Sequence, residues 1–422
     1  MQLPAAAEEA LPWCENRSLL ARAPEAAAIL YGALDASNYT NVVWIGRDDE
    51  VPDDVVAVLE PWQSVLARRA EFRRNRRRRW WETAWARNRD DLTAPKVIAV
   101  HRTDRGRFAL DERGDWQAAK NATTVVADEP GLSCAFLCGA LNSELLDLWY
   151  ALRGRTPRDI WRDYEPKPMN EMPYRHVPTP DGWKPGLEVE RLAEMLAGRD
   201  TAAAIAATDV IRAALGTPEG DADARTAVEH LVRAIAANRR ALLPLRAVAP
   251  ELRRAVKNPW RTQDVMVTPA GVLAELPESD VRSIRLDPAL TIEITTDGVL
   301  GRPQLETNLD GSVLCFRHSR RVTARVEGPR ERLELLLQTL PAGSRMTAGE
   351  LRTARVPVDL YAFDQAVMQR QTHIQQLLED GRLLVEAVER LVCALYAVPD
   401  ALTERVIASA VSRAGTTGAE DE

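Results

Sequence analysis

The spacing of apolar residues changes several times along this chain of 422 residues. Short β-branched runs such as Lys96–Val100 are typical of strands, whereas residues 188–255 carry apolar residues at helical spacing. From about Val265 the period becomes two, which indicates strands, and residues 362–395 return to helical spacing. Because strands and helices occupy largely separate stretches, the pattern predicts an α+β fold.

These changes of period divide the chain into four predicted regions: a mixed α/β domain at 1–180, a helical connector at 188–260, a β-rich region at 261–345 and C-terminal helices at 346–415. The β-rich region is predicted to be a small antiparallel meander, with hairpin turns at Asp297-Gly298 and Asp310-Gly311. In the first region we predict strands at 42–46, 96–100 and 123–128, and a strand from Phe108 that turns at Gly114 and starts a second strand near Trp116. One helix is predicted over 136–154, with Leu152 on its apolar side. The helix over 362–395 is expected to loosen at Gly381.

A basic run interrupts the first region. Between Arg68 and Arg89 there are ten Arg and two acidic residues, and Trp80, Trp81 and Trp85 lie in the same window. Basic residues interleaved with aromatics are typical of a phosphate-binding surface, although a solvated helix face or a network of internal ion pairs would give the same pattern. The three Trp are more typical of a core than of stacking platforms for bases.

The distribution of charge supports one dedicated anionic partner. The formal net charge is −7, which argues against a general nucleic-acid coat protein. Residues 1–60 carry a net charge of −8 and residues 61–120 a net charge of +8. The five Cys have no zinc-ligand spacing and no apolar run reaches the length of a membrane span, so we expect a cytoplasmic protein with reduced thiols.

Residues 155–178 are rich in Pro, aromatic and basic residues. Pro157, Pro166, Pro168 and Pro173 exclude one continuous regular element over this stretch. A loop of this length is more often functional than a simple connector. Arginines in it could grip guanine edges through two parallel hydrogen bonds.

Four separated stretches follow one family pattern. They are WWETAWARNRDDLTAPKVIAV, then FALDERGDW, then LNSELLDLWY followed by YEPKPMNEMPY, and far downstream VERLVCALYAVPDALTERVI. In this order they resemble the C-terminal target-recognition half, or TaqI-like specificity domain, of adenine-specific DNA methyltransferases from restriction–modification and phage-defence systems. The resemblance covers roughly residues 68–178 and 387–410. Met172-Pro173-Tyr174 and Ala397-Val398 depart from the family pattern.

The resemblance implies double-stranded DNA as a partner and supplies a set of candidate contacts. Lys96 would lie near the DNA-facing edge of a strand. Asn142 and Ser143 fit a helix-entry device better than base readers. The full set is Arg73, Arg74, Arg76, Arg77, Arg78 and Arg79 in the basic run, Lys96, and Arg153, Arg155, Arg158, Arg162 and Lys167 in and just before the Pro-rich segment.

Catalytic motifs of such enzymes are missing from the sequence. Methylation of an adenine amino group needs a Pro-Pro-aromatic loop that holds the flipped base, and this chain has no Pro-Pro dipeptide. Asn258-Pro259-Trp260 comes closest and is expected to be a turn. There is no Gly-rich cofactor turn, so S-adenosylmethionine is expected on another chain or on a missing N-terminal half. The five His lack ligand spacing, so no metal is expected.

Three functions remain open at this point. The chain could be the DNA-recognition component of a split adenine-N6 methyltransferase, the C-terminal part of a single-chain enzyme, or an interaction scaffold that does not touch DNA. An apolar stripe at Leu384, Val388, Leu391 and Leu395 could be either a core face or the docking surface for a catalytic chain. An upstream, in-frame Pro-Pro-Tyr type loop would distinguish the second function from the first.

Overall fold

The α+β prediction is confirmed. The structure, a computed structural model, describes residues 20–46, 49–69, 79–83, 93–118, 122–127, 129, 132–153, 155–158, 161–261, 265–308, 311–318, 321–340 and 346–416. Contacts group the chain into two units, where the sequence analysis divided it into four regions. Unit 1 comprises Met1–Ala241, Val256–Arg261 and Asp380–Glu422, and unit 2 comprises Leu242–Ala255 and Thr262–Glu379. Residues distant in sequence therefore share unit 1.

A three-stranded antiparallel sheet lies in the first part of unit 1. Its central strand is β3 (Lys96–Val100), flanked by β5 (Phe108–Asp111) and β6 (Ala122–Val125). All five residues of β3 are buried, as the apolar run predicts. The strands predicted at these positions are confirmed. The strand predicted to begin near Trp116 is only an isolated bridge residue.

The single helix predicted over residues 136–154 is divided into two helices in the structure. Helix α6 (Cys134–Asn142) ends at Ser143, and α7 (Glu144–Arg153) begins directly after it. The Ser143 hydroxyl donates to the carbonyl of Ala140 and accepts from the Leu146 amide, so it closes one helix and caps the next. The helix-entry prediction for Ser143 is therefore confirmed.

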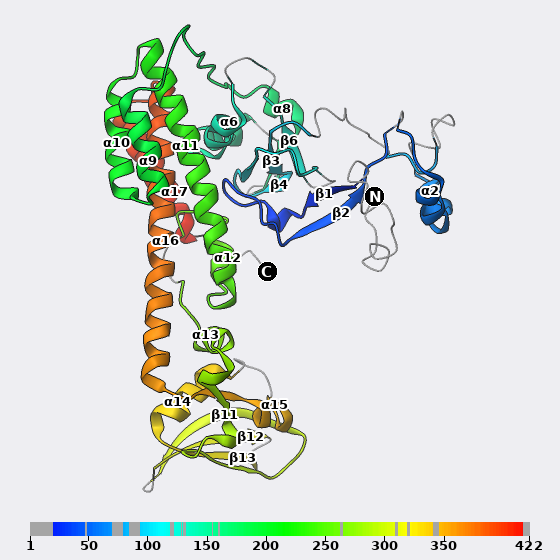
Figure 1. Cartoon of the computed structure of the whole chain (residues 1–422), viewed down its shortest axis with the longest axis vertical. Coiled ribbons are helices and arrows are strands. Elements are labelled where there is room, and N and C mark those ends of the chain that lie inside the picture. Colours follow the sequence, from blue (N-terminus) through cyan, green and yellow to red (C-terminus); the bar gives the residue numbers. More distant parts are fainter. Residues whose placement is uncertain are drawn as a thin grey trace. The chain divides into compact units, whose positions relative to one another are not determined.

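A bundle of helices lies beside α6 in unit 1 (Figure 1). These helices are α9 (Leu187–Ala197), α10 (Thr201–Ala213), α11 (Pro218–Leu242), α17 (Asp400–Thr416) and the C-terminal part of α16 (Leu360–Leu395). A Cβ built on Gly139 of α6 would come within 2.7 Å of Val228 on α11 and 3.6 Å of Val388 on α16. Glycine thus permits the close approach of α6 to both long helices.

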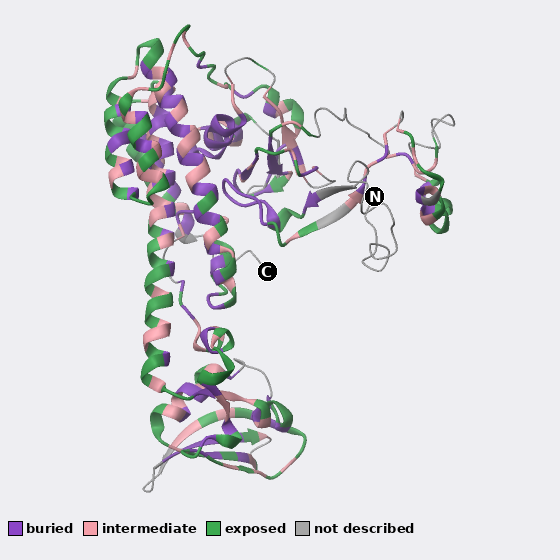
Figure 2. Cartoon of the chain, viewed as in Figure 1, coloured by how far each residue is buried: buried purple, intermediate pink, exposed green. Residues whose placement is uncertain are grey.

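The apolar stripe on α16 belongs to this interior. Leu384, Val388, Leu391 and Leu395 are all buried in the main core of unit 1 (Figure 2). The docking-surface interpretation is therefore wrong for these residues, and the core interpretation is right. The physical reason is that these residues pack inside a core shared with residues of α6 and α11, which leaves no apolar surface there for a second chain.

The N-terminal part of unit 1 contains a small two-stranded sheet and a separate cluster. Strand β1 (Leu20–Pro24) pairs with β2 (Tyr39–Val43). Helix α2 (Asp53–Leu59) buries Val55 and Leu59 against Val43 and Ile45. Trp80 and Trp81 pack on this cluster, edge to face with ring centroids 5.2 Å apart. These two Trp are partly buried against the cluster, which agrees with the core interpretation only in part, while Trp85 lies outside the described residues.

The Pro-rich segment folds into short elements. Strand β7 (Arg155–Arg158) pairs with β8 (Trp161–Asp163), which pairs in turn with β4 (Arg102–Thr103). A one-turn helix, α8 (Pro166–Asn170), follows. Because the strand order is β4-β8-β7, strand β7 is an edge strand of this sheet.

Unit 2 is built on a five-stranded antiparallel sheet in the order β10-β13-β12-β11-β14. The strands are β10 (Thr291–Ile294), β11 (Val299–Asn308), β12 (Gly311–His318), β13 (Arg321–Gly328) and β14 (Met346–Thr347). Helices α14 (Arg330–Thr339) and α15 (Ala348–Thr353) cover one face and close an apolar core that contains Leu314, Phe316, Leu333 and Leu336.

The meander is confirmed for β11, β12 and β13, whose register places Asn308 opposite Gly311. The hairpin at Asp297-Gly298 is wrong, because β10 pairs with β13 and not with the β11 strand that follows it. Helix α16 also runs unbroken through Gly381, so the expected loosening there is not observed.

Candidate nucleic-acid interface

The candidate contacts from the basic run fall mostly outside the described residues, which exclude Arg73, Arg74, Arg76, Arg77 and Arg78. Arg79 is described and exposed. Its neighbour in the fold, Arg69, donates to the backbone carbonyls of Trp80 and Glu82 at 2.9 and 3.0 Å. Arg69 therefore supports the fold through backbone carbonyls, while the predicted network of internal ion pairs stays a prediction, and Arg79 is exposed at the surface.

Two of the predicted DNA contacts are buried instead. Lys96 is 1% exposed, and its Nζ lies 3.2 Å from Asp111 Oδ2 on the neighbouring strand β5. Arg162 is 9% exposed and pairs with Asp147. Both predictions of DNA contact are wrong for this structure, because each cation neutralises a buried carboxylate of the protein itself.

The remaining candidates surround the hairpin formed by β7 and β8. Arg153, the last residue of α7, is exposed, and so is Lys167 in α8. Arg155 and Arg158 lie in the edge strand β7, where only the backbone is described. Leu152, next to Arg153, is 86% exposed, although helical spacing predicted it on the apolar face. We call residues 152–170 the arginine hairpin.

The arginine hairpin is tied down at its base by charged and aromatic contacts. Asp163 accepts two hydrogen bonds from Arg102 of β4, at 2.6 and 3.1 Å. Tyr164 stacks on Tyr150 of α7 with ring centroids 4.4 Å apart and meets Phe108 of β5 edge to face. Bidentate arginine–carboxylate pairs and stacked rings fix orientation as well as distance. The base of the hairpin is therefore a fixed part of unit 1.

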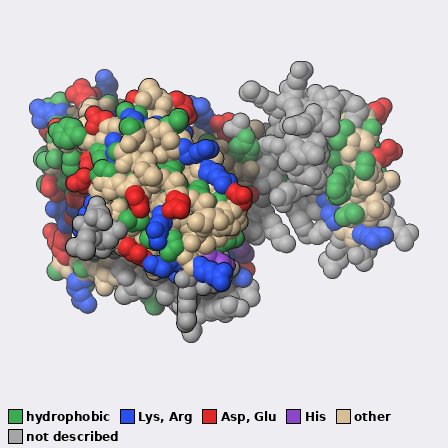
Figure 3. Space-filling view, turned by 90° about the horizontal axis from the view of Figure 1, so that it is seen from below, with side chains coloured by type: hydrophobic (Ala, Val, Ile, Leu, Met, Phe, Trp, Pro, Cys, Tyr) green, Lys and Arg blue, Asp and Glu red, His purple; other side chains and the backbone are tan. Residues whose placement is uncertain are grey.

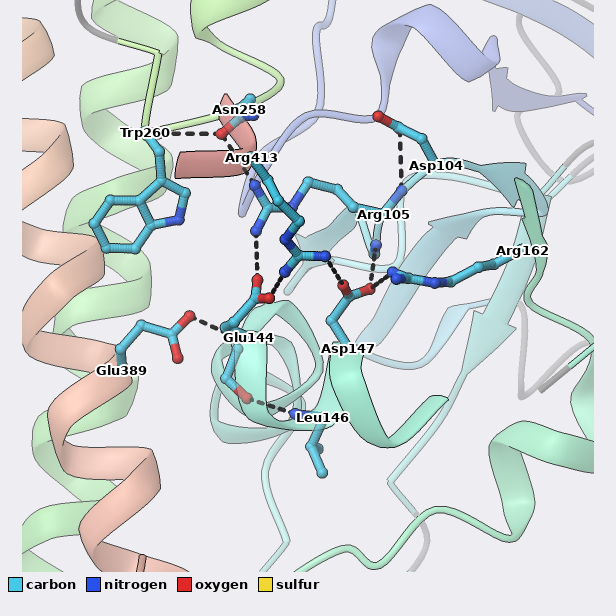
Figure 4. Close-up of polar contacts among 12 residues, drawn as sticks. Asp104, Arg105, Glu144, Leu146, Asp147, Arg162, Asn258, Trp260, Glu389 and Arg413 are labelled. Atoms are coloured by element: carbon cyan, nitrogen blue, oxygen red, sulfur yellow. Dashed lines mark hydrogen bonds and ion pairs between the residues drawn. The ribbon is translucent and has the colours of Figure 1, made fainter. Parts of the chain in front are cut away.

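A buried ion cluster lies behind this base (Figure 4). Its centre is a pair of carboxylates one turn apart on α7, Glu144 and Asp147, which are 0% and 3% exposed. Three arginines point at them from different elements: Arg105 before β5, Arg162 on β8 and Arg413 on α17. Helix α16 contributes Glu389, whose Oε1 accepts from the Glu144 amide at 2.7 Å.

Asp147 holds the arginine hairpin directly. Its Oδ1 accepts from the Tyr164 hydroxyl at 2.8 Å, from the Gly106 amide at 2.9 Å and from Arg162. Its Oδ2 lies 3.8 Å from Arg413. One carboxylate thus joins β8, the turn before β5 and α17. Removing it would leave Arg162 buried without its partner.

Glu144 joins the other elements. Its Oε2 accepts from Arg105 at 2.7 Å, and it forms a second ion pair with Arg413. Arg105 also donates to Asn258 at 3.2 Å. Asn258 and Trp260 form the turn expected from the sequence, with the Trp260 amide donating to Asn258 Oδ1 at 3.1 Å. The Asn258-Pro259-Trp260 fragment is therefore structural.

Burial shifts the pKa of two groups in and beside this cluster, Glu389 and Tyr164. Burial raises the pKa of Glu389 to about 8, Arg105 lowers it and Asp147 raises it further. Burial also raises the pKa of Tyr164 well above its usual value, with Asp147 acting in the same direction. A carboxyl group with a pKa near 8 is mostly protonated at neutral pH, so Glu389 does not add a full negative charge.

The ion pairs of this cluster hold the surrounding elements in place, and its carboxylates are not free for metal or acid–base chemistry. Arginine guanidiniums occupy the oxygens of Glu144 and Asp147 that a metal or a substrate would need. Among the described residues there is no group of three or more metal-ligating side chains. Asn142 is likewise structural: its side chain accepts from the amide and donates to the carbonyl of Phe108.

Sequence reasoning missed this cluster, since its members are spread from residue 105 to residue 413. Two local signals were present. Glu144 and Asp147 stand at helical spacing among Leu145, Leu146 and Leu148, and Glu389 stands between Val388 and Leu391. A charged residue inside an apolar stripe predicts a buried partner, but does not identify it.

Charged side chains of both signs are interspersed on the face drawn in Figure 3, among the residues coloured there. Within the described ranges, no helix combines the length and low polarity that crossing a bilayer requires.

No protein-family model matches the sequence. No curated protein is significantly similar to it either.

Proposed function

We propose that this chain is the DNA target-recognition component of an adenine-N6 methyltransferase whose catalytic and S-adenosylmethionine-binding parts belong to a separate chain. The observation that carries the proposal is the arginine hairpin. It combines an exposed Arg153, an exposed Lys167 and an edge strand carrying Arg155 and Arg158 on a base fixed by ion pairs to two buried carboxylates, Asp163 and Asp147. Recognition residues need such rigid support to select one DNA sequence.

Two further observations support this function. The family motifs occur in the expected order, and the Pro-Lys strand, the Asn-Ser-Glu step and the Pro-rich segment all belong to unit 1. The sequence lacks a Pro-Pro dipeptide, so adenine chemistry is assigned to the partner. Arg79 adds a second exposed cation outside the hairpin.

Duplex binding measured by fluorescence anisotropy tests the proposal. The double variant Arg153→Ala/Lys167→Ala is expected to bind labelled duplex at least about tenfold more weakly at low salt, because two phosphate contacts are lost. The slope of log affinity against log salt should fall by about 2, roughly one per lost contact. The variant Lys184→Ala/Arg191→Ala removes the same charge from other exposed positions and is the control.

Wild-type protein that binds no duplex even at low salt would favour the interaction-scaffold alternative. Equal losses in both double variants would mean that net charge, and not the arginine hairpin, governs binding. To test the division of labour, the neighbouring reading frames are sequenced, and any methyltransferase chain that they encode is mixed with this chain. Adenine methylation by the mixture, and by neither chain alone, is the expected result. An in-frame Pro-Pro-Tyr type loop upstream would instead identify a single-chain enzyme.

A further inference from the structure

The two edges of the five-stranded sheet in unit 2 differ. At one edge, β14 is two residues long and leads directly into α15, whose N-cap is Thr347. At the other edge, β10 pairs with β13 and with no other described strand. A very short edge strand leaves few backbone groups unpaired, whereas an uncovered edge strand offers a row of them to a further strand. Strand β10 is therefore the edge at which this sheet can be extended.

The register shows which backbone groups of β10 point outward. The Thr295 amide donates to the Thr323 carbonyl at 3.0 Å, so these two residues form a hydrogen-bonded pair. Hydrogen-bonded and non-hydrogen-bonded pairs alternate along an antiparallel ladder, so Glu293 also bonds to β13. The N–H and C=O groups of Ile292 and Ile294 therefore point away from β13. The described backbone makes no other hydrogen bond to them.

The side chains of this edge are incompletely covered. Ile292 and Ile294 pack against the apolar core of unit 2 but are only partly buried. Glu293 lies between them, so its side chain points to the opposite face of the sheet, where it is exposed. Arg325 stands opposite Glu293 on β13, yet no ion pair joins the two side chains among the described contacts. A further strand would cover both Ile side chains and reach the Glu293 carboxylate.

We propose that β10 binds an extended segment of another protein chain, which joins the sheet as a sixth strand and carries a basic residue opposite Glu293. Peptides add to sheet edges through main-chain hydrogen bonds, and side chains at alternate positions provide specificity. In an antiparallel alignment, the residue opposite Glu293 belongs to a non-hydrogen-bonded pair, whose Cα atoms are only about 4.5 Å apart. Apolar residues on either side of this basic residue would cover Ile292 and Ile294.

A second copy of this chain fits the edge less well. Two copies of β10 that pair about a two-fold axis through Ile292 and Ile294 place Glu293 of one copy opposite Glu293 of the other. Like charges directly opposite each other destabilise a strand pair. The partner is therefore a different chain. Its docking edge belongs to unit 2, whereas the buried stripe at Leu384–Leu395 and the arginine hairpin belong to unit 1.

The probe is a fluorescein-labelled peptide, Ser-Thr-Val-Lys-Val-Thr-Ser, which is titrated with the full-length protein by fluorescence anisotropy. Its two Val stand opposite Ile292 and Ile294, and its Lys stands opposite Glu293. Saturable binding is expected, together with slower hydrogen exchange at residues 291–295. A peptide N-methylated at both Val lacks two N–H donors for β10 and should bind at least about tenfold more weakly.

A charge swap tests the choice of partner. Glu293→Lys should weaken binding of the Lys peptide about fivefold and should instead favour a peptide with Glu in place of Lys, because attraction and repulsion exchange places. Glu331→Lys makes the same charge change at an exposed position of α14 and should bind like the wild type. Both substitutions are at exposed positions, so the fold should be retained.

Ile292→Pro tests the backbone contact separately. Pro removes one outward N–H group and is tolerated on edge strands, so this variant should bind the Lys peptide about fivefold more weakly. All eleven Trp lie in unit 1, so far-ultraviolet circular dichroism, and not Trp fluorescence, checks that unit 2 is folded in each variant.

Absence of saturable binding by the wild type would overturn the proposal, as would equal binding of the N-methylated and unmodified peptides. An unchanged preference for the Lys peptide in Glu293→Lys would show that this edge does not select a basic residue. A wild-type dimer in sedimentation velocity that Ile292→Pro abolishes would identify a second copy, and not another chain, as the occupant. None of these measurements involves DNA, so this inference and the proposed function can fail separately.

Discussion

The two units of this protein differ in how deeply their ion pairs are buried, although both also carry surface pairs. In unit 1, Arg105, Arg162 and Lys96 pair with carboxylates that are 0% to 3% exposed. In unit 2, most of the described pairs lie on the surface, such as Arg317–Glu306, with side chains 40% and 41% exposed, and Arg330–Glu334, with 63% and 42%. Arg332–Asp287 is a partly buried exception, with side chains 17% and 1% exposed.

This contrast follows from the size of the sheets. Unit 2 has a five-stranded sheet whose face packs on α14 and α15, besides a two-stranded sheet of β9 (Val281–Ser283) and β15 (Arg355–Pro357). Apolar burial on the larger sheet can define its arrangement. Unit 1 has sheets of two and three strands, too small to determine how the arginine hairpin is oriented. Directional ion pairs to Glu144 and Asp147 provide that orientation.

The largest expected effect is on Asp147. Asp147→Asn should lower the free energy of unfolding of unit 1 by about 3–5 kcal/mol, because Arg162 would lose its buried counter-charge. Denaturant titration followed by Trp fluorescence measures it. Asp209→Asn removes a surface partner of Arg212 in the same unit and is the control. Similar curves for both variants would remove the distinction between buried and exposed pairs.

Glu389 should make the stability of unit 1 depend on pH. Its pKa of about 8 in the folded protein exceeds that of an unfolded Glu, roughly 4.3, so the folded state binds this proton more tightly. Stability is therefore lost as the pH rises from roughly 4.3 to about 8. Glu389→Gln should be more stable than the wild type by a few kcal/mol at about pH 9 and nearly equal at about pH 5.

The measurement is Tm against pH by Trp fluorescence, with Glu386→Gln on the same helix as the matched amide substitution. A constant difference between Glu389→Gln and the wild type across this range would show that the Glu389 carboxyl does not titrate in the folded protein as described.

A glycine in a helix of each unit, Gly381 in unit 1 and Gly349 in unit 2, tests how closely the two units are packed. A Cβ at Gly381 would lie 2.7 Å from Asn238 Oδ1, so Gly381→Ala should destabilise unit 1 by ~1–3 kcal/mol despite its better helix propensity. At Gly349 in α15 the nearest atom would lie 3.9 Å away, and Gly349→Ala should stabilise unit 2 by up to ~1 kcal/mol. Trp fluorescence follows the first variant, and far-ultraviolet circular dichroism follows the second. Effects of the same sign would contradict the close packing at Gly381.

The smallest effect is expected on the surface of unit 2. Arg317 lowers the pKa of Glu306, so the pair stabilises the folded protein above the usual Glu pKa and this contribution is lost as the pH falls. Glu306→Gln should therefore lower Tm slightly at neutral pH and low salt, and the difference should vanish at high salt. A difference that persists in high salt would mean that this pair is not screened like a surface pair.

Sequence alone determined the identity of elements whose apolar period is regular. Strands β3 and β6 lie where the spacing predicted them, and β11, β12 and β13 form the predicted meander, because side-chain period and β-branching act over a few residues. The turn at Asn258 and the helix cap at Ser143 were also predictable, since both depend on side chains that bond to nearby backbone.

Only the tertiary structure decided which elements meet and which charges are buried. Pairing of β10 with β13, burial of Lys96 and Arg162, and the covered stripe at Leu384–Leu395 each depend on residues far away in the sequence. Glu144 acquires its partners from Arg105, 39 residues before it, and from Arg413, near the other end of the described chain. A local sequence pattern indicates whether a residue favours a helix or a strand. The free energy of burying a charged side chain depends instead on the partner that the fold brings next to it.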